Sequence, residues 1–278
     1  MRHTGPGPAA RRRDKQEEGG IDICMLASGS GGNATYVRSG DTSILIDAGI
    51  SLKELARRMA GAGVSPETLD AVIISHGHSD HVNGVQVLCR KYGIPVFANK
   101  GTLSEAPAFG GVPRGLACRF TTGARVDVGD LSVVSFPVPH DAAEPVGFVV
   151  TDGRVKLCYA TDLGSLTLEV LSSFSDCDAA VIESNHDETM LREGPYPEML
   201  KRRVRGPLGH LSNDDAAELL RGIMHGGLRQ VALAHLSRTN NRPEIPLDTI
   251  TRALGGSGTP PEISLGWQDK ASVLITIG

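Results

Sequence analysis

Three histidines and one aspartate are concentrated in a single short segment, Ser-His-Gly-His-Ser-Asp-His, at residues 75–81. The segment directly follows the apolar run at residues 71–74, which has the composition of a buried strand. His76 and His78 are two positions apart, so in an extended chain their side chains point the same way. Imidazole and carboxylate groups that converge from one loop are typical of a divalent metal site. A turn that is merely polar would not need this set, so we favour the metal site.

Asp80 and His81 lie where the chain is expected to turn into a helix, so they can face a second metal ion. One loop cannot complete a site for two ions, and further ligands should therefore follow other strands. His140, Asp162 and His235 each come directly after an apolar run. Singly, such residues are more often ordinary loop residues. Together with the first segment, we expect them to form one ligand set at a shared edge of the sheets.

The rest of the chain predicts strands and helices that would position these ligands. Apolar runs typical of strands occur at residues 21–26, 34–37, 43–46, 71–74, 94–97, 131–138, 146–150, 155–160, 179–182, 230–234 and 272–277. Apolar residues recur at helical spacing near residues 52–59, 82–89, 101–106, 166–171, 216–223 and 247–254. Ser79 and Ser212 are expected to cap the second and fifth of these helices.

The order of these elements predicts an α/β fold. In each half of the chain, predicted strands are followed by helices and then by further strands. No linker divides the two halves. Two sheets packed back to back, with helices on their outer faces, would bury the apolar runs. We therefore expect one domain at residues 21–278, a four-layer αββα sandwich. Residues 1–20 are rich in glycine, proline and charge, which predicts a disordered tail or, as an alternative, a nucleic-acid-binding arm.

The composition indicates which compartment and which kinds of partner to expect. About 40% of the residues are hydrophobic, which is ample for a core. The net charge of -4 argues against a surface coated for nucleic acid, although not against a small basic groove. The 5 cysteines are widely spaced with no CxxC pair, which favours a reduced, cytoplasmic compartment. No apolar run approaches the length of a membrane span, and no signal peptide is recognisable.

The motif spacing resembles that of the metallo-β-lactamase superfamily from residue 21 onward. Asp47, in Leu-Ile-Asp-Ala-Gly, resembles the first motif, whose carboxylate supports the metal-ligand loop without binding metal. Residues 75–81 resemble the second motif, and the third, fourth and fifth are represented by His140, Asp162 and His235. The resemblance implies two divalent ions with Asp162 between them. It assigns His76, His78 and His140 to one ion, and Asp80, His81 and His235 to the other.

A narrower similarity is to the YycJ/WalJ type of bacterial exonucleases, which implies 5′-to-3′ cleavage of DNA. Five segments carry it, at residues 28–33, 183–187, 196–203, 209–213 and 235–241. Aspartate rather than cysteine at position 162 implies a harder site, compatible with Mn²⁺ as well as Zn²⁺. The chain departs from the family in the extra tail 1–20 and in Gly77, where glutamate is common. It also has no long insertion between Asp162 and His235, so the second domain of larger nucleases is absent.

The expected mechanism uses hydroxide that the two metal ions generate from water near neutral pH. Asp80 can orient this nucleophile as well as bind metal. His210, just before the helix capped by Ser212, is our candidate for protonating the leaving oxygen. The alternative for His210 is a hydrogen bond to backbone at the helix start, with no catalytic role.

Substrate contacts are expected from four places. Ser30 and Asn33 lie in a glycine-rich loop that could place backbone N–H groups at a phosphate, or could be a plain hairpin loop. His186 could contact substrate or brace a loop, and three polar residues follow His235, namely Ser237, Arg238 and Asn240. A basic cluster, either a DNA-backbone contact or a solvated face, consists of Lys201, Arg202, Arg203 and Arg205.

Three other functions remain open from the sequence. The same dinuclear centre could hydrolyse a small ester, thioester or lactone, or could process RNA. A metal-stabilised adaptor without catalysis is the third. The expected partner is nucleic acid, DNA in preference to RNA, with no membrane, and a homodimer is one of the oligomeric states left open.

Overall fold

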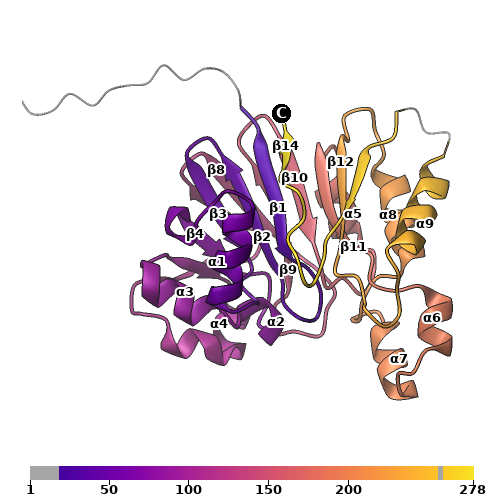
Figure 1. Cartoon of the computed structure of the whole chain (residues 1–278), viewed down its shortest axis with the longest axis horizontal. Coiled ribbons are helices and arrows are strands. Elements are labelled where there is room, and N and C mark those ends of the chain that lie inside the picture. The colour runs from indigo at the N-terminus through magenta and orange to yellow at the C-terminus, as the bar shows by residue number, and fades with distance from the viewer. Residues whose placement is uncertain (1–18, 256–258) are drawn as a thin grey trace, which may run out of the picture.

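A computed structural model describes residues 19–255 and 259–278. Two seven-stranded sheets pack against each other, and helices cover their outer faces (Figure 1). This arrangement confirms the predicted four-layer αββα sandwich. The predicted tail, residues 1–20, lies outside the described residues except for Gly19 and Gly20.

The first sheet has the order β14-β1-β2-β3-β4-β5-β6. Its strands are β1 (Ile21–Ala27), β2 (Ala34–Ser39), β3 (Thr42–Ile46), β4 (Ala71–Ile73), β5 (Val96–Ala98), β6 (Ala117–Arg119) and β14 (Ile275–Ile277). From β3 to β6 the strands are parallel. The last strand is shorter than the predicted 272–277. Ser272 satisfies the Met25 N–H through its Oγ, at 3.0 Å, so regular pairing with β1 begins only at Ile275.

The second sheet has the order β13-β12-β11-β10-β9-β8-β7. Its strands are β7 (Arg125–Val128), β8 (Leu131–Pro137), β9 (Val146–Thr151), β10 (Lys156–Ala160), β11 (Ala179–Glu183), β12 (Gln230–Ala234) and β13 (Glu262–Leu265). Strands β10 to β13 are parallel. Because β8 and β10 are both antiparallel to β9, β8 runs in the same direction as β10.

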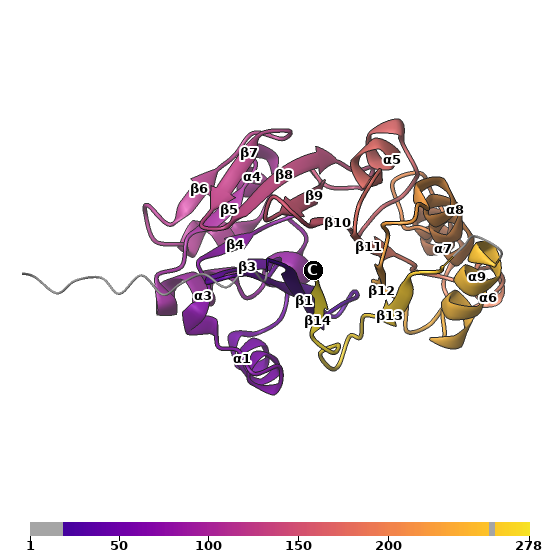
Figure 2. The ribbon, with the colours of Figure 1, turned by 90° about the horizontal axis from the view of Figure 1, so that it is seen from above.

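Helices form the two outer layers (Figure 2). The first sheet is covered by α1 (Leu52–Gly61), α2 (Ser79–Val82), α3 (Val85–Tyr92) and α4 (Lys100–Glu105). The second is covered by α5 (Leu168–Phe174), α8 (Asn213–Ile223) and α9 (Glu244–Leu254), while α6 (Glu188–Glu193) and α7 (Glu198–Val204) lie near one end of it. Two 3₁₀ turns occupy Pro66–Thr68 and Pro107–Gly111. None of the helices in the described residues has the length and apolarity needed to cross a membrane.

The core explains why the strand segments are apolar at nearly every position. In β1, Ile23 and Met25 contribute to the core between the sheets, whereas Cys24 and Leu26 pack beneath the helices of the outer layer. Successive side chains of a strand point to opposite faces, so burial of both faces requires a continuous apolar run.

Two capping predictions have different outcomes. Ser212 caps α8 as predicted, in a reciprocal capping box with Asp215. The prediction for Ser79 is wrong, because His78 is the N-cap of α2, and no side chain caps that helix. The predicted continuous helix at residues 82–89 is also interrupted. The Gly84 N–H donates to the Ala48 carbonyl at 2.7 Å instead of continuing the first turn, and α3 starts afresh at Val85.

Candidate metal centre

The predicted ligands meet at one edge of the sandwich because the strands before them share a direction within each sheet. The site residues that follow a strand or end it are Asp47 (β3), His76–His81 (β4), His140 (β8), Asp162 (β10), Glu183 (β11) and His235 (β12). The two sheets are joined at this edge by a hydrogen bond from the Val146 N–H to the Ser75 carbonyl at 3.0 Å. Loops far apart in the sequence therefore open into one cleft.

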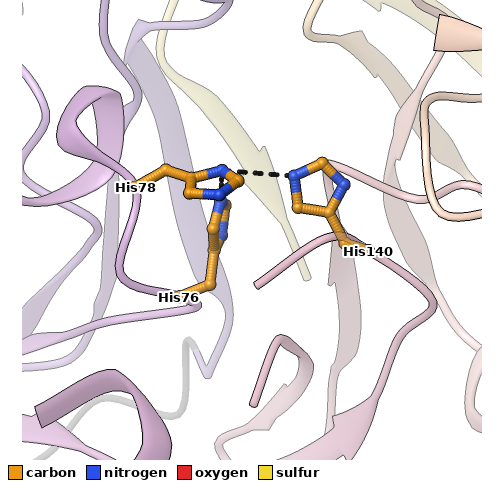
Figure 3. A group of neighbouring side chains, drawn as sticks. All are labelled: His76, His78 and His140. Carbon is orange, nitrogen blue, oxygen red and sulfur yellow. Dashed lines mark hydrogen bonds between the residues drawn. The ribbon is translucent and has the colours of Figure 1, made fainter. Parts of the chain in front are cut away.

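One donor set consists of His76, His78 and His140 (Figure 3). His78 Nδ1 lies 3.1 Å from His76 Nε2 and 3.3 Å from His140 Nε2. Two nitrogens bound to one tetrahedral cation, each at about 2.0–2.1 Å, would be roughly 3.3 Å apart. The spacing of the three imidazoles therefore fits one divalent ion.

A second donor set consists of Asp80, His81 and His235. Asp80 Oδ2 lies 3.7 Å from His81 Nε2 and 3.9 Å from His235 Nε2. Asp162 lies between the two sets: its carboxylate is 3.1 Å from His81 Nε2 and 3.5 Å from His235 Nε2. The same carboxylate is 3.8 Å from His140 Nε2 in the first set.

An unpaired nitrogen in the second donor set, Nε2 of His235, indicates that this set suits a cation. His235 is 1% exposed, and its Nε2 has no hydrogen-bond partner among the described residues although it faces two carboxylates. A buried polar atom without a partner costs about 1–3 kcal/mol. A divalent ion at this position would satisfy the nitrogen and offset the negative charge of Asp80 and Asp162.

Other contacts fix the orientation of the imidazoles. His81 Nδ1 lies 2.8 Å from Asp47 Oδ2, and His235 Nδ1 lies 2.9 Å from Glu183 Oε1. His140 Nδ1 lies 3.1 Å from the Gly209 carbonyl. Each of these partners keeps a proton on Nδ1 and leaves Nε2 as the atom able to bind metal. Asp47 therefore lies where a supporting carboxylate is expected, behind His81.

The backbone is strained at three of these positions. Asp47, Asp162 and His235 have φ angles of 60°, 56° and 57°, in the left-handed region that side chains other than glycine rarely adopt. Only one other non-glycine residue in the described part of the chain, Asp176, has a positive φ. Such strain persists where the surrounding structure imposes it, and it concentrates at functional sites.

Electrostatics divide the imidazoles into two kinds. Burial, together with the charge of His81, holds the pKa of His76 well below its ordinary value. Burial also acts on His81, but Asp47 and Asp162 outweigh it and raise the pKa of His81 well above its ordinary value. Against burial, Asp162 and Glu183 raise the pKa of His235 to about 10. Protons on His81 and His235 therefore balance the neighbouring carboxylates, and a divalent ion bound there would take over that role.

Glu183 belongs to the site, although the sequence assigned it no role. It is fully buried, and its Oε1 lies 2.8 Å from His210 Nδ1 as well as 2.9 Å from His235 Nδ1. Its Oε2 accepts from the Leu163 N–H at 2.8 Å. The available signal was an acid at the end of an apolar strand, because buried carboxylates are rare unless they are paired.

The donor sets open into a cleft of about 270 Å³. Its lining includes His78, Asp80, His140, Asp162, His210 and His235. Asp141, which the sequence analysis did not single out, also lines the cleft, and its Oδ2 accepts from Arg203 Nε at 2.7 Å. His210 therefore lies beside the ligands, with Glu183 as its side-chain partner. This contact differs from the backbone bond considered as the alternative.

The structure separates the predicted substrate residues. Ser30 and Ser237 line the cleft. Asn33 is buried behind it, with Nδ2 2.9 Å from His81 Nε2. His186 and Asn240 are buried and lie outside the cleft lining. The remaining residue, Arg238, lines a neighbouring cavity instead.

The basic cluster is also divided. Arg203 lines the cleft, whereas Lys201 is buried and donates through Nζ to the Arg192 carbonyl at 2.7 Å. Arg202 and Arg205 are exposed and lie outside the cleft lining. One member of the cluster is therefore placed to meet a substrate in the cleft.

Fold and donor sets together define a metal-dependent hydrolase. The family model described as "Beta-lactamase superfamily domain" matches residues 42–235, and the chain belongs to this superfamily. It is 36% identical over 240 residues to "Exodeoxyribonuclease YycJ" of Bacillus anthracis, which covers 86% of this chain and 91% of the relative. "Exodeoxyribonuclease WalJ" of Streptococcus pneumoniae is 36% identical over 238 residues, covering 84% and 88%.

Solved structures agree on the fold. The metallo-beta-lactamase fold protein YhfI from Bacillus subtilis superposes with a TM-score of 0.69, covering 91% of this chain and 99% of its own. At 16% identity, this likeness supports the fold alone. The predicted resemblance to the YycJ/WalJ-type exonucleases is thus confirmed by sequence, and the predicted sandwich by structure.

Proposed function

We propose that this chain is a metal-dependent exodeoxyribonuclease that removes nucleotides from the 5′ end of DNA. The observation that carries the proposal is that two three-residue donor sets, with Asp162 between them, open into one cleft beside His210. The names of the two relatives, each similar over most of both chains, support DNA as the substrate.

The donor sets suit Zn²⁺ or Mn²⁺. One set is all imidazole, and the other combines imidazole with carboxylate, while neither contains a thiol. Nitrogen and oxygen donors without sulfur are compatible with both ions. When bound, two such ions lower the pKa of water and neutralise charge on a phosphodiester. Asp80, at the cleft wall, can accept a hydrogen bond from the attacking water and so orient it.

His210 is placed to protonate the leaving oxygen. Although burial acts to lower it, the contact with Glu183 raises the pKa of His210 above its ordinary value. The raised pKa favours the ring that carries a proton on both nitrogens, and Glu183 engages only Nδ1. Nε2 remains available to donate to an oxygen in the cleft.

End-labelled substrates test this proposal. The metal-stripped protein is supplied with Mn²⁺ or Zn²⁺ and given DNA or RNA labelled at the 5′ or the 3′ end. We expect early release of labelled mononucleotide from 5′-labelled DNA only. Cleavage of RNA alone would support RNA processing, and turnover of a thioester without nucleic-acid cleavage would support a small-ester hydrolase.

The non-catalytic alternative needs a separate test. Asp80→Ala removes a cleft carboxylate while leaving the strands intact. We expect this variant to lose nuclease activity and to fail to replace the wild-type chain in cells. An adaptor would lose little cellular activity.

A further inference from the structure

A second cavity, of about 230 Å³, lies next to the metal cleft. Ser237, in the segment that follows β12, lines both cavities, so the two adjoin at this residue. We call this second cavity the base pocket, and its lining includes Ser28, Arg238, Arg242 and Trp267.

The walls of the base pocket are tied directly to a metal ligand. Ser28 Oγ accepts a hydrogen bond from the His235 N–H at 2.7 Å. The Ser28 N–H in turn donates to the Trp267 carbonyl at 2.9 Å. A molecule bound against Trp267 would therefore be held in a fixed relationship to the metal centre.

We propose that the base pocket binds the nucleobase of a nucleotide adjacent to the scissile phosphodiester. In this proposal the base stacks on Trp267, and the neighbouring phosphate pairs with Arg238 and Arg242. The proposal rests on the proposed function, because it takes the substrate to be a nucleic-acid strand that passes from the metal cleft over Ser237.

Charge at the rim favours a phosphate. Arg238 and Arg242 are exposed, and among the described residues no hydrogen bond or ion pair engages either guanidinium. Arg203 in the metal cleft is different, because Asp141 pairs with it. Asp269 also lines the rim, but the two guanidiniums outnumber it. Free guanidinium groups bind phosphate through paired, charge-assisted hydrogen bonds.

Trp267 contributes an aromatic side chain to the lining of the base pocket. Its ring is partly buried and packs against the core beneath the second sheet, while Lys270 Nζ lies 4.2 Å from its centroid. Gln268 anchors the same segment by donating to the Leu236 carbonyl at 3.0 Å. Stacking on an aromatic ring tolerates any base, which suits an exonuclease that must accept successive nucleotides.

Intrinsic fluorescence tests the base pocket without relying on cleavage, because Trp267 is the chain's 1 tryptophan. The metal-loaded protein is titrated with a phosphorothioate oligothymidylate that resists hydrolysis, and with an abasic oligomer of equal length. We expect the oligothymidylate to quench the emission and the abasic oligomer to leave it unchanged. Equal quenching by the two oligomers, or no quenching by either, would overturn the proposal that this pocket binds a nucleobase.

Two substitutions at one position separate stacking from a structural role. Trp267→Leu should weaken binding of a fluorescein-labelled oligothymidylate about tenfold, whereas Trp267→Phe should retain most of it, because phenylalanine can still stack. Equal losses in the two variants, or no loss in either, contradict the proposal. Metal content and thermal midpoints show whether either variant is damaged, and Leu168→Ala, at an exposed position on α5, is the matched control.

If Trp267→Leu does not fold, the arginines provide the second test. Arg238→Gln combined with Arg242→Gln should reduce the slope of log affinity against log salt by about two for oligothymidylate. An unchanged slope would overturn the phosphate contact. Quenching by oligothymidylate without cleavage of ordinary DNA would keep the pocket and reject the exonuclease, whereas cleavage without quenching would do the reverse.

Discussion

Glu183 Oε1, in a fully buried carboxylate, lies 2.8 Å from Nδ1 of His210, a residue that lines the metal cleft. The same oxygen lies 2.9 Å from Nδ1 of His235, a member of the second donor set. Burial acts to raise the pKa of Glu183, but His210 and His235 outweigh it and hold that pKa at about 2. The carboxylate therefore stays ionised, and it acts on the protonation both of His210, the proton-donor candidate, and of His235 in the second donor set.

Replacing this carboxylate should move the pH dependence of cleavage. If His210 acts as an acid, activity falls as pH rises through its pKa, which Glu183 keeps high. In Glu183→Gln the charge is gone, so we expect the fall to begin roughly one pH unit or more lower. The measurement is kcat for a DNA substrate across pH. Glu169→Gln, at an exposed position, is the control. If kcat of Glu183→Gln falls at the same pH as that of the wild type, Glu183 does not set the pKa of the acid.

His210 itself can be tested through the leaving group. His210→Gln should lower kcat for DNA by about 100-fold or more, because an alkoxide leaving group needs a proton. Bis(p-nitrophenyl) phosphate has a leaving group that departs without one, so its hydrolysis should fall far less. His225→Gln is the matched control, since His225 lies outside the cleft and contacts the Cys177 carbonyl. Equal losses with the two substrates would point to damage at the metal centre instead.

Sequence and structure agree best where residue type and position relative to a strand were both informative. His140 and His235 could be predicted because each follows an apolar run, and parallel strands place such residues at one edge. The signal for Glu183, an acid at the end of an apolar strand, was not sufficient to assign it a role, because a single acid there has no characteristic spacing. Its role depends on His210, which comes from a loop 27 positions away.

The same contrast holds for the fold. The apolar residues at 82–89 keep helical spacing, yet the helix is interrupted at Gly84. The Gly84 N–H donates to the carbonyl of Ala48, 36 positions earlier. Strand β13 and the base pocket beside it carry no periodic signal either. Contacts between distant segments decided these features, and local sequence patterns do not record such contacts.

Asp47 should support metal binding without contacting metal. Its two carboxylate oxygens accept from the Ser75 N–H at 2.8 Å and from Ser75 Oγ at 2.8 Å, and Oδ2 also faces His81 Nδ1. Asp47→Ala leaves these buried groups unpaired, so we expect metal affinity to drop about 10–100-fold. Asp47→Asn keeps the shape and should lose less. Metal titration by calorimetry measures both, with exposed Asp41→Asn as the control, and unchanged affinity in Asp47→Ala would contradict the role.

Metal removal should change how stability depends on pH. In the metal-free chain the pKa of His235 is about 10, above its ordinary 6.5, so its stabilising contribution is complete below 6.5 and is lost as pH rises toward 10. The raised pKa of His81 acts in the same direction. Metal binding requires neutral imidazole, so its stabilisation grows with pH. We therefore expect Mn²⁺ to raise the thermal midpoint more above about pH 8 than near neutrality, and a rise that is independent of pH would contradict this.

Arg203 is the member of the basic cluster best placed to contact a phosphate. Arg203 lines the metal cleft, and its Nε donates to Asp141 Oδ2. The other carboxylate oxygen of Asp141 lies 3.4 Å from His140 Nε2. Because each phosphate contact releases counterions, Arg203→Gln should reduce the slope of log affinity against log salt by about one, equally for all DNA sequences. Arg202→Gln, exposed and outside the cleft, should leave the slope unchanged. Equal effects at the two positions would instead assign the cluster a diffuse attraction to DNA, because only a contact in the cleft distinguishes Arg203 from its neighbour.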